Sequence, residues 1–250
     1  MSEIDISSES LADISEAKED VSSSIKKRLP QIIGIVILVV IIATILLLTI
    51  GRNGDSTSEL TTDASTLIEA EELFNRGNFK EAIPKLEVYV EEYPKDAEAR
   101  SLYSQALWLK GDSKEAINQF KLVLKDVPDN VDTLYRLGIL YAQVGKDNES
   151  LESLKKAVVI NPDQASSQAE LAKAYTRVNK YDEAIVSWRK AFNLSSPTNI
   201  SYKASIMAEI GNTYLLKKDD ENAKKAYQEG LSIEPENQFL KSQLSNLNGS

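Results

Sequence analysis

The sequence predicts an all-α protein, in which one membrane-spanning helix is followed by a solenoid of helical hairpins and a final capping helix. Two observations lead to this fold class. Residues 29–51 form an apolar run without any charged side chain. Further along the chain, Pro94, Pro128 and Pro162 recur with a spacing of 34 residues, which indicates a repeated structural unit.

Composition narrows the classes of function. The 250 residues carry a formal net charge of −9 and include no His and no Cys. An acidic chain argues against general nucleic-acid binding, because phosphate contacts need clustered Lys and Arg. Nucleophile–His pairs and Cys- or His-held metals are excluded, and the sequence contains no glycine-rich phosphate loop. We therefore expect neither an enzyme nor a protein that needs a cofactor or metal.

Residues 29–51 predict a transmembrane helix. The twenty residues 31–50, at about 1.5 Å each, span about 30 Å, which is the thickness of a bilayer hydrocarbon core. Fifteen of them are Ile, Leu or Val. A buried core helix or strand is the alternative, but a charge-free run this long is atypical of one. The run is too long for a signal-peptide core and lacks an Ala-x-Ala exit, so it indicates an uncleaved signal anchor.

The charges beside this run predict its orientation. Lys26, Lys27 and Arg28 precede it, and only Arg52 follows closely. The positive-inside rule places residues 1–28 in the cytoplasm and the remainder outside, as in a single-pass protein of the plasma or inner membrane. The reversed orientation, with cytoplasmic repeats, stays open.

The segments that flank the run are expected to lack a fixed fold. Residues 1–28 are acidic and rich in Ser, which is typical of a disordered tail, although a small amphipathic docking helix is the alternative. Residues 52–62 predict a flexible linker. The repeats then occupy residues 63–248.

Other positions recur in phase with the prolines. Gly77, Gly111 and Gly145 share the period, and repeats begin near residues 63, 97, 131, 165 and 204. Each repeat has a small residue on its first helix, a large one three positions later, and a large one on its second helix. The small residues are Ala70, Ser104, Gly138, Ala172 and Gly211. The large ones are Leu73, Leu107, Tyr141, Tyr175 and Tyr214, followed by Leu86, Phe120, Leu154, Trp188 and Tyr227.

This pattern resembles the tetratricopeptide repeat family over roughly residues 63–235. The resemblance implies a right-handed α-solenoid of about five helix-turn-helix repeats, each made of a helix A and a helix B. A small residue on helix A lets helix B approach closely, glycine suits the left-handed turn, and proline ends helix B. Some other array of helical hairpins is the alternative.

Several positions depart from the family pattern. Asn179 replaces the turn glycine in the fourth repeat, and Lys218 replaces it in the fifth. Five extra residues around 197–201 predict a longer loop or an extended helix start. Leucines at helical spacing predict a capping helix over about 236–248, which solenoids need for a soluble end.

In this family, helix A positions that face away from helix B line a concave groove. Such a groove can take an extended or helical peptide, or a protein partner, with Trp108 and Tyr135 as apolar anchors. Trp188 occupies a helix B packing position and is expected in the core. The resemblance implies a groove lined by Gln105, Trp108, Tyr135, Arg136, Ile139, Gln143, Lys173, Arg177 and Asn212.

The cations of this set allow two interpretations. Arg136, Lys173 and Arg177 together could hold a carboxylate. Alternatively, they are solvated or paired with Asp132 and Glu170. Both interpretations stay open.

Some family members bind chaperone C-termini through a Lys/Asn clamp on their first repeats. The matching positions of this chain hold Leu67, Glu71 and Gln105, so we do not expect that clamp.

Together these features predict a membrane-anchored scaffold or adaptor on the extracytoplasmic side. It would bind a protein or peptide partner and assist assembly, secretion or envelope processes, in an arrangement similar to bacterial single-span repeat proteins. Two alternatives remain: a structural spacer that self-associates as a homo-oligomer, and the same adaptor facing the cytoplasm.

Overall fold

A computed structural model describes residues 56–248, with side chains described from Ala64 onward. The predicted tail, the predicted membrane helix and the first linker residues therefore lie outside the described residues. The chain divides into two units, Met1–Ala64 and Ser65–Ser250. Across residues 56–248, every helix is too short or too polar to cross a membrane.

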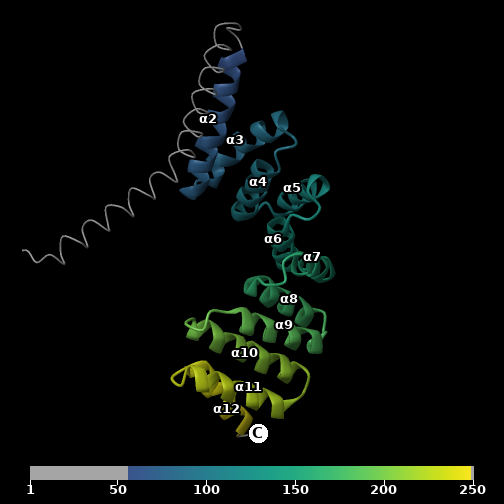
Figure 1. Cartoon of the computed structure of the whole chain (residues 1–250), viewed down its shortest axis with the longest axis vertical. Coiled ribbons are helices and arrows are strands. Elements are labelled where there is room, and N and C mark those ends of the chain that lie inside the picture. Colours follow the sequence, from purple (N-terminus) through teal and green to yellow (C-terminus); the bar gives the residue numbers. More distant parts are fainter. Residues whose placement is uncertain (1–55, 249–250) are drawn as a thin grey trace, which may run out of the picture. The chain divides into compact units, whose positions relative to one another are not determined.

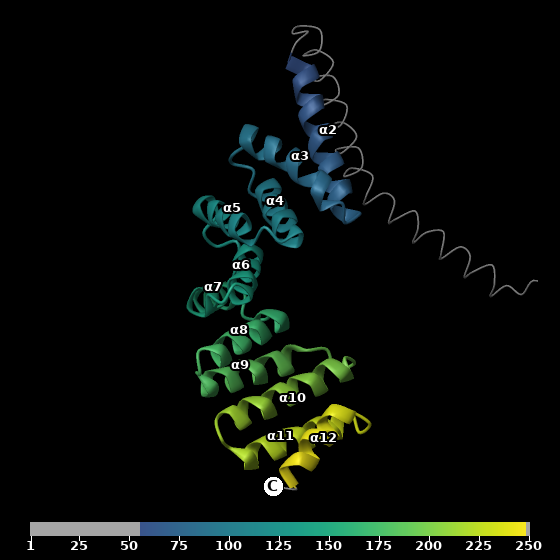
Figure 2. The ribbon, with the colours of Figure 1, turned by 180° about the vertical axis from the view of Figure 1, so that it is seen from behind.

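The described residues form eleven α-helices and no strand, which follow one another along the chain (Figures 1 and 2). From α3 onward each helix packs on the next one in sequence. The A helices of the five repeats are α2 (Ser56–Asn75), α4 (Ala97–Lys110), α6 (Val131–Gln143), α8 (Ala165–Arg177) and α10 (Ile200–Leu216). The B helices are α3 (Phe79–Glu92), α5 (Ser113–Asp126), α7 (Asp147–Ile160), α9 (Tyr181–Leu194) and α11 (Asp220–Ile233), and α12 (Gln238–Asn248) follows them.

Small residues on the A helices meet large residues on the B helices, as the sequence predicted. A Cβ atom built at Gly138 would lie only 2.6 Å from Cγ of Leu154. A Cβ atom at Gly211 would enter the ring of Tyr227, which is fully buried. The pairing of small with large side chains thus sets the spacing within each hairpin.

The turn between helix A and helix B has the same left-handed backbone in all five repeats. Gly77, Gly111 and Gly145 have φ angles of 79°, 102° and 74°. Asn179 and Lys218 adopt φ angles of 61° and 63° at the equivalent positions. The fifth turn therefore forms despite its lysine, in a conformation that disfavours a side chain.

Three helix boundaries differ from the sequence expectation or refine it. The first A helix begins at Ser56, so residues 56–62 of the expected linker are helical, and no Gly or Pro in residues 55–76 interrupts them. The five extra residues before the fifth repeat supply an extended helix start, because α10 begins at Ile200. The capping helix begins at Gln238, two residues later than expected, and buries Leu240 completely.

Polar side chains fix two of the junctions between repeats. Arg100 is buried and donates from Nη2 to the carbonyl of Pro94, at 3.1 Å. Gln168, which lies two periods later, donates from Nε2 to the carbonyl of Pro162, also at 3.1 Å. At these two junctions, the turn that leaves the B helix is therefore satisfied by a side chain of the following A helix.

Candidate functional site

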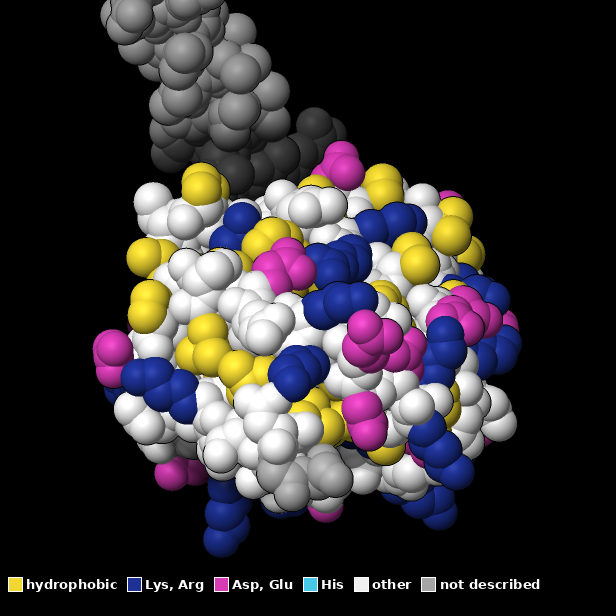
Figure 3. All heavy atoms as spheres, turned by 90° about the horizontal axis from the view of Figure 1, so that it is seen from below, with side chains coloured by type: hydrophobic (Ala, Val, Ile, Leu, Met, Phe, Trp, Pro, Cys, Tyr) yellow, Lys and Arg dark blue, Asp and Glu magenta, His cyan; other side chains and the backbone are white. Residues whose placement is uncertain are grey.

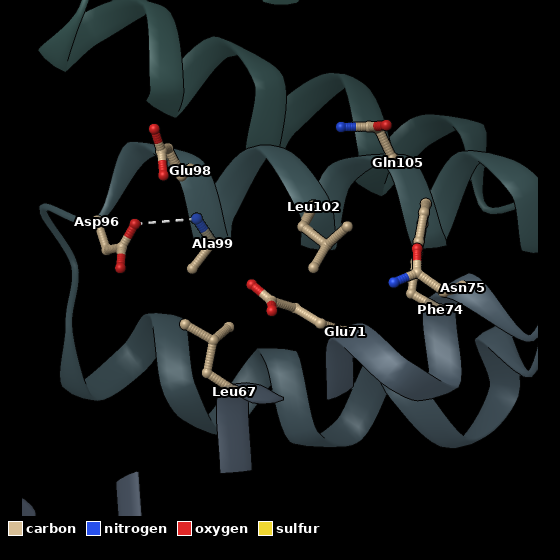
Figure 4. Close-up of a pocket in the computed structure, with 9 residues that line it drawn as sticks. All are labelled: Leu67, Glu71, Phe74, Asn75, Asp96, Glu98, Ala99, Leu102 and Gln105. Carbon is tan, nitrogen blue, oxygen red and sulfur yellow. Dashed lines mark hydrogen bonds between the residues drawn. The ribbon is translucent and has the colours of Figure 1, made fainter. Parts of the chain in front are cut away.

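Two clefts open between A helices on the face that we call the A-helix face, formed by α2, α4, α6, α8 and α10. The N-terminal cleft lies between α2 and α4 and has a volume of about 340 Å³ (Figure 4). The C-terminal cleft lies mainly between α8 and α10, with a volume of about 200 Å³. The N-terminal cleft is lined by Leu67, Glu71, Phe74, Asn75, Asp96, Glu98, Ala99, Leu102 and Gln105. The C-terminal cleft is lined by Ser166, Ala169, Glu170, Lys173, Trp188, Tyr202, Ser205, Ile206 and Glu209.

Helix capping fixes one wall of the N-terminal cleft. Oδ1 of Asp96 accepts a hydrogen bond from the backbone N–H of Ala99 at 2.9 Å, which caps α4 (dashed line in Figure 4). Its other oxygen accepts from the hydroxyl of Tyr89 at 3.2 Å. Glu71 projects from α2 between Leu67 and Leu102, toward the middle of the cleft (Figure 4). The carboxylate of Glu71, which has no ion-pair partner among the described residues, therefore stands between apolar walls.

The C-terminal cleft combines one phenol, that of Tyr202, with one ion pair. Nζ of Lys173 lies 2.7 Å from Oε1 of Glu170. Tyr202 lies close enough to Lys173 and Glu170 for their charges to affect its pKa. Tyr135 of α6 interacts electrostatically with the same two groups. The Ser166 side chain hydrogen-bonds Tyr135. Three A helices thus bring polar groups to one place.

Tyr202 in this cleft and Tyr135 beside it both stay neutral at ordinary pH. Burial raises the pKa of Tyr135, and the carboxylate of Glu170 raises it further. Burial is also the main cause that raises the pKa of Tyr202, against an opposing effect of Lys173. Neutral hydroxyls can both donate and accept hydrogen bonds, which suits recognition of peptide groups.

Several of the predicted groove residues hold the helices together. Nε1 of Trp108 donates to Oε1 of Gln143 at 2.7 Å, which links α4 to α6. Nη1 of Arg177 donates to the carbonyl of Ala142 at 3.0 Å, and so satisfies the end of α6. The Asn212 side chain accepts from the hydroxyl of Tyr227 at 2.8 Å.

The predicted cations have partners of their own. Nε of Arg136 lies 2.6 Å from Oδ2 of Asp132. Lys173 pairs with Glu170, as described above. The structure thus has the paired arrangement, which is the second of the two interpretations that the sequence left open. Trp188 is 3% exposed, which confirms its place in the core.

One column of the A-helix face recurs in phase through the five repeats. It contains Glu71, Gln105, Ile139, Lys173 and Asn212, with the five-residue extension before the last member. Four of its five members belong to the predicted groove. Along the column the side chain changes from acid to amide, to aliphatic, to base and to amide. The same backbone position therefore presents a different chemistry in each repeat.

Sequence reasoning missed Tyr202. It lies in the extension before residue 204, where the repeat period is broken and either a loop or a helix was expected. The only available signal was an aromatic residue within that extension. Ser166 and Glu209 were also missed, because their cleft depends on how α8 and α10 approach each other.

Comparisons with known proteins agree with this architecture. Two family models described as tetratricopeptide repeat match residues 73–136 and residues 131–164 and 204–237. No curated protein sequence matches the chain.

Solved structures share the fold at low sequence identity. A fragment of MamA from Desulfovibrio magneticus RS-1 superposes with a TM-score of 0.64 at 21% identity, covering 70% of this chain and 97% of that one. YrrB, described as a tetratricopeptide protein with an unusual peptide-binding site, gives 0.64 at 17% identity, covering 76% and 98%.

Proposed function

Because the chain belongs to the tetratricopeptide repeat family, we propose that it is a non-enzymatic scaffold that binds a peptide or protein partner on its A-helix face. The observation that carries this proposal is the C-terminal cleft. There Tyr202 and the Lys173–Glu170 pair line a recess that is open to solvent, and Tyr135 of α6 lies close enough to interact with the same charged groups. The peptide-binding site named for YrrB supports the same use of the fold.

The groups in this cleft suit recognition without chemistry. Neutral tyrosines supply a large, rigid contact area together with a hydrogen-bonding hydroxyl. Lys173 and Glu170 neutralise each other, so a partner need not carry a strong charge at this point. Ser205 donates its hydroxyl to the carbonyl of Tyr202 at 2.7 Å and so is already engaged. The cleft therefore favours a peptide side chain held by stacking and hydrogen bonds.

The proposal includes a membrane anchor. Residues 29–51 would span the bilayer, residues 1–28 would lie in the cytoplasm, and the repeats would lie outside. This arrangement rests on the apolar run and on Lys26, Lys27 and Arg28 beside it. A scaffold held there would assist assembly, secretion or envelope processes.

Photo-crosslinking in cells tests both parts of the proposal. A photo-reactive amino acid replaces Tyr135 in the full-length chain, and a matched chain carries it at the exposed Glu152 on the B helix α7. We expect a discrete crosslinked protein from position 135 that is missing from position 152. The compartment of that protein reports the side of the membrane. Crosslinks only within the chain itself would overturn partner binding in this cleft.

A second candidate function is self-association as a structural spacer. The end of the stack at α12 exposes hydrophobic side chains among polar ones (Figure 3). Phe239 on α12 is 48% exposed. If the spacer function is correct, the full-length chain will sediment as a concentration-dependent oligomer that Phe239→Ser abolishes. A monomer at all concentrations would exclude it.

A further inference from the structure

We propose that the N-terminal cleft binds the side chain of an arginine or lysine in the partner. This inference rests on the proposed function, since it names the chemistry of one part of the partner. Such a side chain has an aliphatic stem and a charged end, and the cleft has groups that complement each. Its apolar walls would contact the stem, and its carboxylates would pair with the charged end.

The walls of the cleft are apolar and preformed. Leu67, Phe74 and Leu102 are partly buried and pack against the largest hydrophobic core cluster of the described residues. Each also borders the cleft, whose volume is about 340 Å³ (Figure 4). Methylene groups of a bound side chain would cover these surfaces without rearrangement of the core.

Within the described residues, the two glutamates of the cleft lack the ion pairs that neighbouring glutamates of α2 form. On α2, Glu69 pairs with Lys85 at 2.8 Å and Glu72 pairs with Arg76 at 3.2 Å. Glu71, which lies between them in sequence and points into the cleft, forms no ion pair within residues 64–248. Glu98, at the start of α4, forms none in that range either. Among the described glutamates of α2 and α4, those without a cation are therefore Glu71 and Glu98, which border the recess.

No basic side chain lines this cleft within the described part of the chain. Lys173 occupies the same column three repeats later and neutralises Glu170 there. The carboxylates do not converge as metal ligands, because residues 56–248 contain no group of three or more Asp or Glu arranged to hold a metal ion. Charge complementarity and the apolar walls together select an organic cation with a long stem.

Fluorescence anisotropy with the full-length chain in detergent tests the inference. The probe is a labelled, end-capped heptapeptide, Gly-Ser-Leu-Arg-Leu-Ser-Gly. One matched peptide carries citrulline, which keeps the shape of arginine without its charge. Another carries 2-amino-3-guanidinopropionate, which keeps the charged guanidinium on a short stem. We expect the arginine peptide to bind about tenfold more tightly than either, because a charge-assisted hydrogen bond is worth roughly one order of magnitude in affinity.

Variants of the chain locate the effect. Glu71→Gln combined with Glu98→Gln should remove the preference for arginine over citrulline. Glu152→Gln removes an equivalent exposed charge on α7 and should leave the preference intact. Since neither cleft glutamate has a hydrogen-bond partner among the described residues, the double variant should fold, which circular dichroism checks.

Equal binding of the arginine and citrulline peptides would overturn the inference, and so would equal binding of the long and short cations. Loss of the preference in Glu152→Gln would show attraction to the net charge alone, and would also overturn it. The proposed function fails separately, through crosslinking at Tyr135. A crosslinked partner together with no arginine preference would leave the scaffold standing and exclude only this cleft.

Discussion

The two clefts of the A-helix face occupy equivalent places in different repeats, yet they differ in charge. Glu71 in the first repeat and Lys173 in the fourth lie three 34-residue periods apart, at the same position of helix A. Among the described residues, Glu71 of the N-terminal cleft forms no ion pair, whereas Lys173 of the C-terminal cleft is paired with Glu170. The comparison shows that the repeat fixes where a side chain stands, while the individual residue decides what it can bind.

The largest effect should come from disturbing the helix spacing that both clefts share. Gly211→Ala places a methyl group in the ring of Tyr227, where α10 packs on α11. We expect a loss of about 3 kcal/mol or more in the free energy of unfolding, because that ring has no space to move. Ala70→Gly, at the same position in the first repeat, should cost only about 1 kcal/mol. Urea unfolding followed by circular dichroism measures both, and equal losses would contradict the spacing argument.

Alkaline pH should destabilise both ends of the stack alike. Burial raises the pKa of Tyr103 to about 12, with smaller effects of Glu87 and Glu115. Burial, followed by Glu209, raises the pKa of Tyr227 to about 12. Since the folded state holds each phenol protonated above its ordinary pKa of 10.0, stability is complete below pH 10 and falls as the pH rises toward 12.

Each of these tyrosines should account for a loss of about 2 to 3 kcal/mol over that pH range. Tyr103→Phe and Tyr227→Phe should each remove its own share of the pH dependence, as measured by urea unfolding at each pH, and the raised pKa values of Tyr135 and Tyr202 should leave a smaller remainder. A wild-type stability that does not change between pH 9 and 12 would contradict the prediction.

Substitutions in the turns between helix A and helix B should have smaller and opposite effects on the free energy of unfolding in the second and fifth repeats. Gly111 has a positive φ that costs glycine nothing, whereas Lys218 has one that disfavours its side chain. Gly111→Ala should therefore destabilise the chain by about 1 kcal/mol, and Lys218→Gly should stabilise it by a similar amount. Thermal unfolding distinguishes the two, and a change of the same sign in both variants would refute the prediction.

One substitution, Glu71→Lys, should change stability least and binding most. Glu71→Lys gives the first repeat the residue of the fourth, and at an exposed position it should alter stability by less than about 0.5 kcal/mol. It should nevertheless abolish the preference for the arginine peptide. Anisotropy and thermal unfolding of the same sample test both statements, and an unchanged preference would contradict the second.

Much of the repeat fold could be predicted from sequence because its requirements are local and periodic. A small residue such as Gly138 under a large one such as Leu154 can be recognised from the period, and so can the left-handed turn at Asn179. The start of the first helix at Ser56 could not be predicted, because the mostly polar residues 56–62 suit a linker and a helix equally well.

Less of the candidate site could be predicted. The repeat period identified the column of A-helix positions but not the partners of its residues. Trp108 and Gln143 bond across 35 residues, and Arg177 bonds the carbonyl of Ala142 across the same separation. Such pairs depend on the distance between consecutive repeats, which a pattern within one repeat does not contain. The predicted groove therefore mixed residues that are free to bind with residues that hold the stack together.

The packing of each helix mainly on its sequence neighbours has a mechanical consequence. No contact closes the stack from its first repeat to its last within the described residues, so a pulling force would pass through the junctions one after another. The bonds of Arg100 and Gln168 to the preceding proline carbonyls lie directly in that path. Under force, the extension of the array would be the sum of the extensions of its junctions. The weakest junction would open first and would set the force that the array withstands.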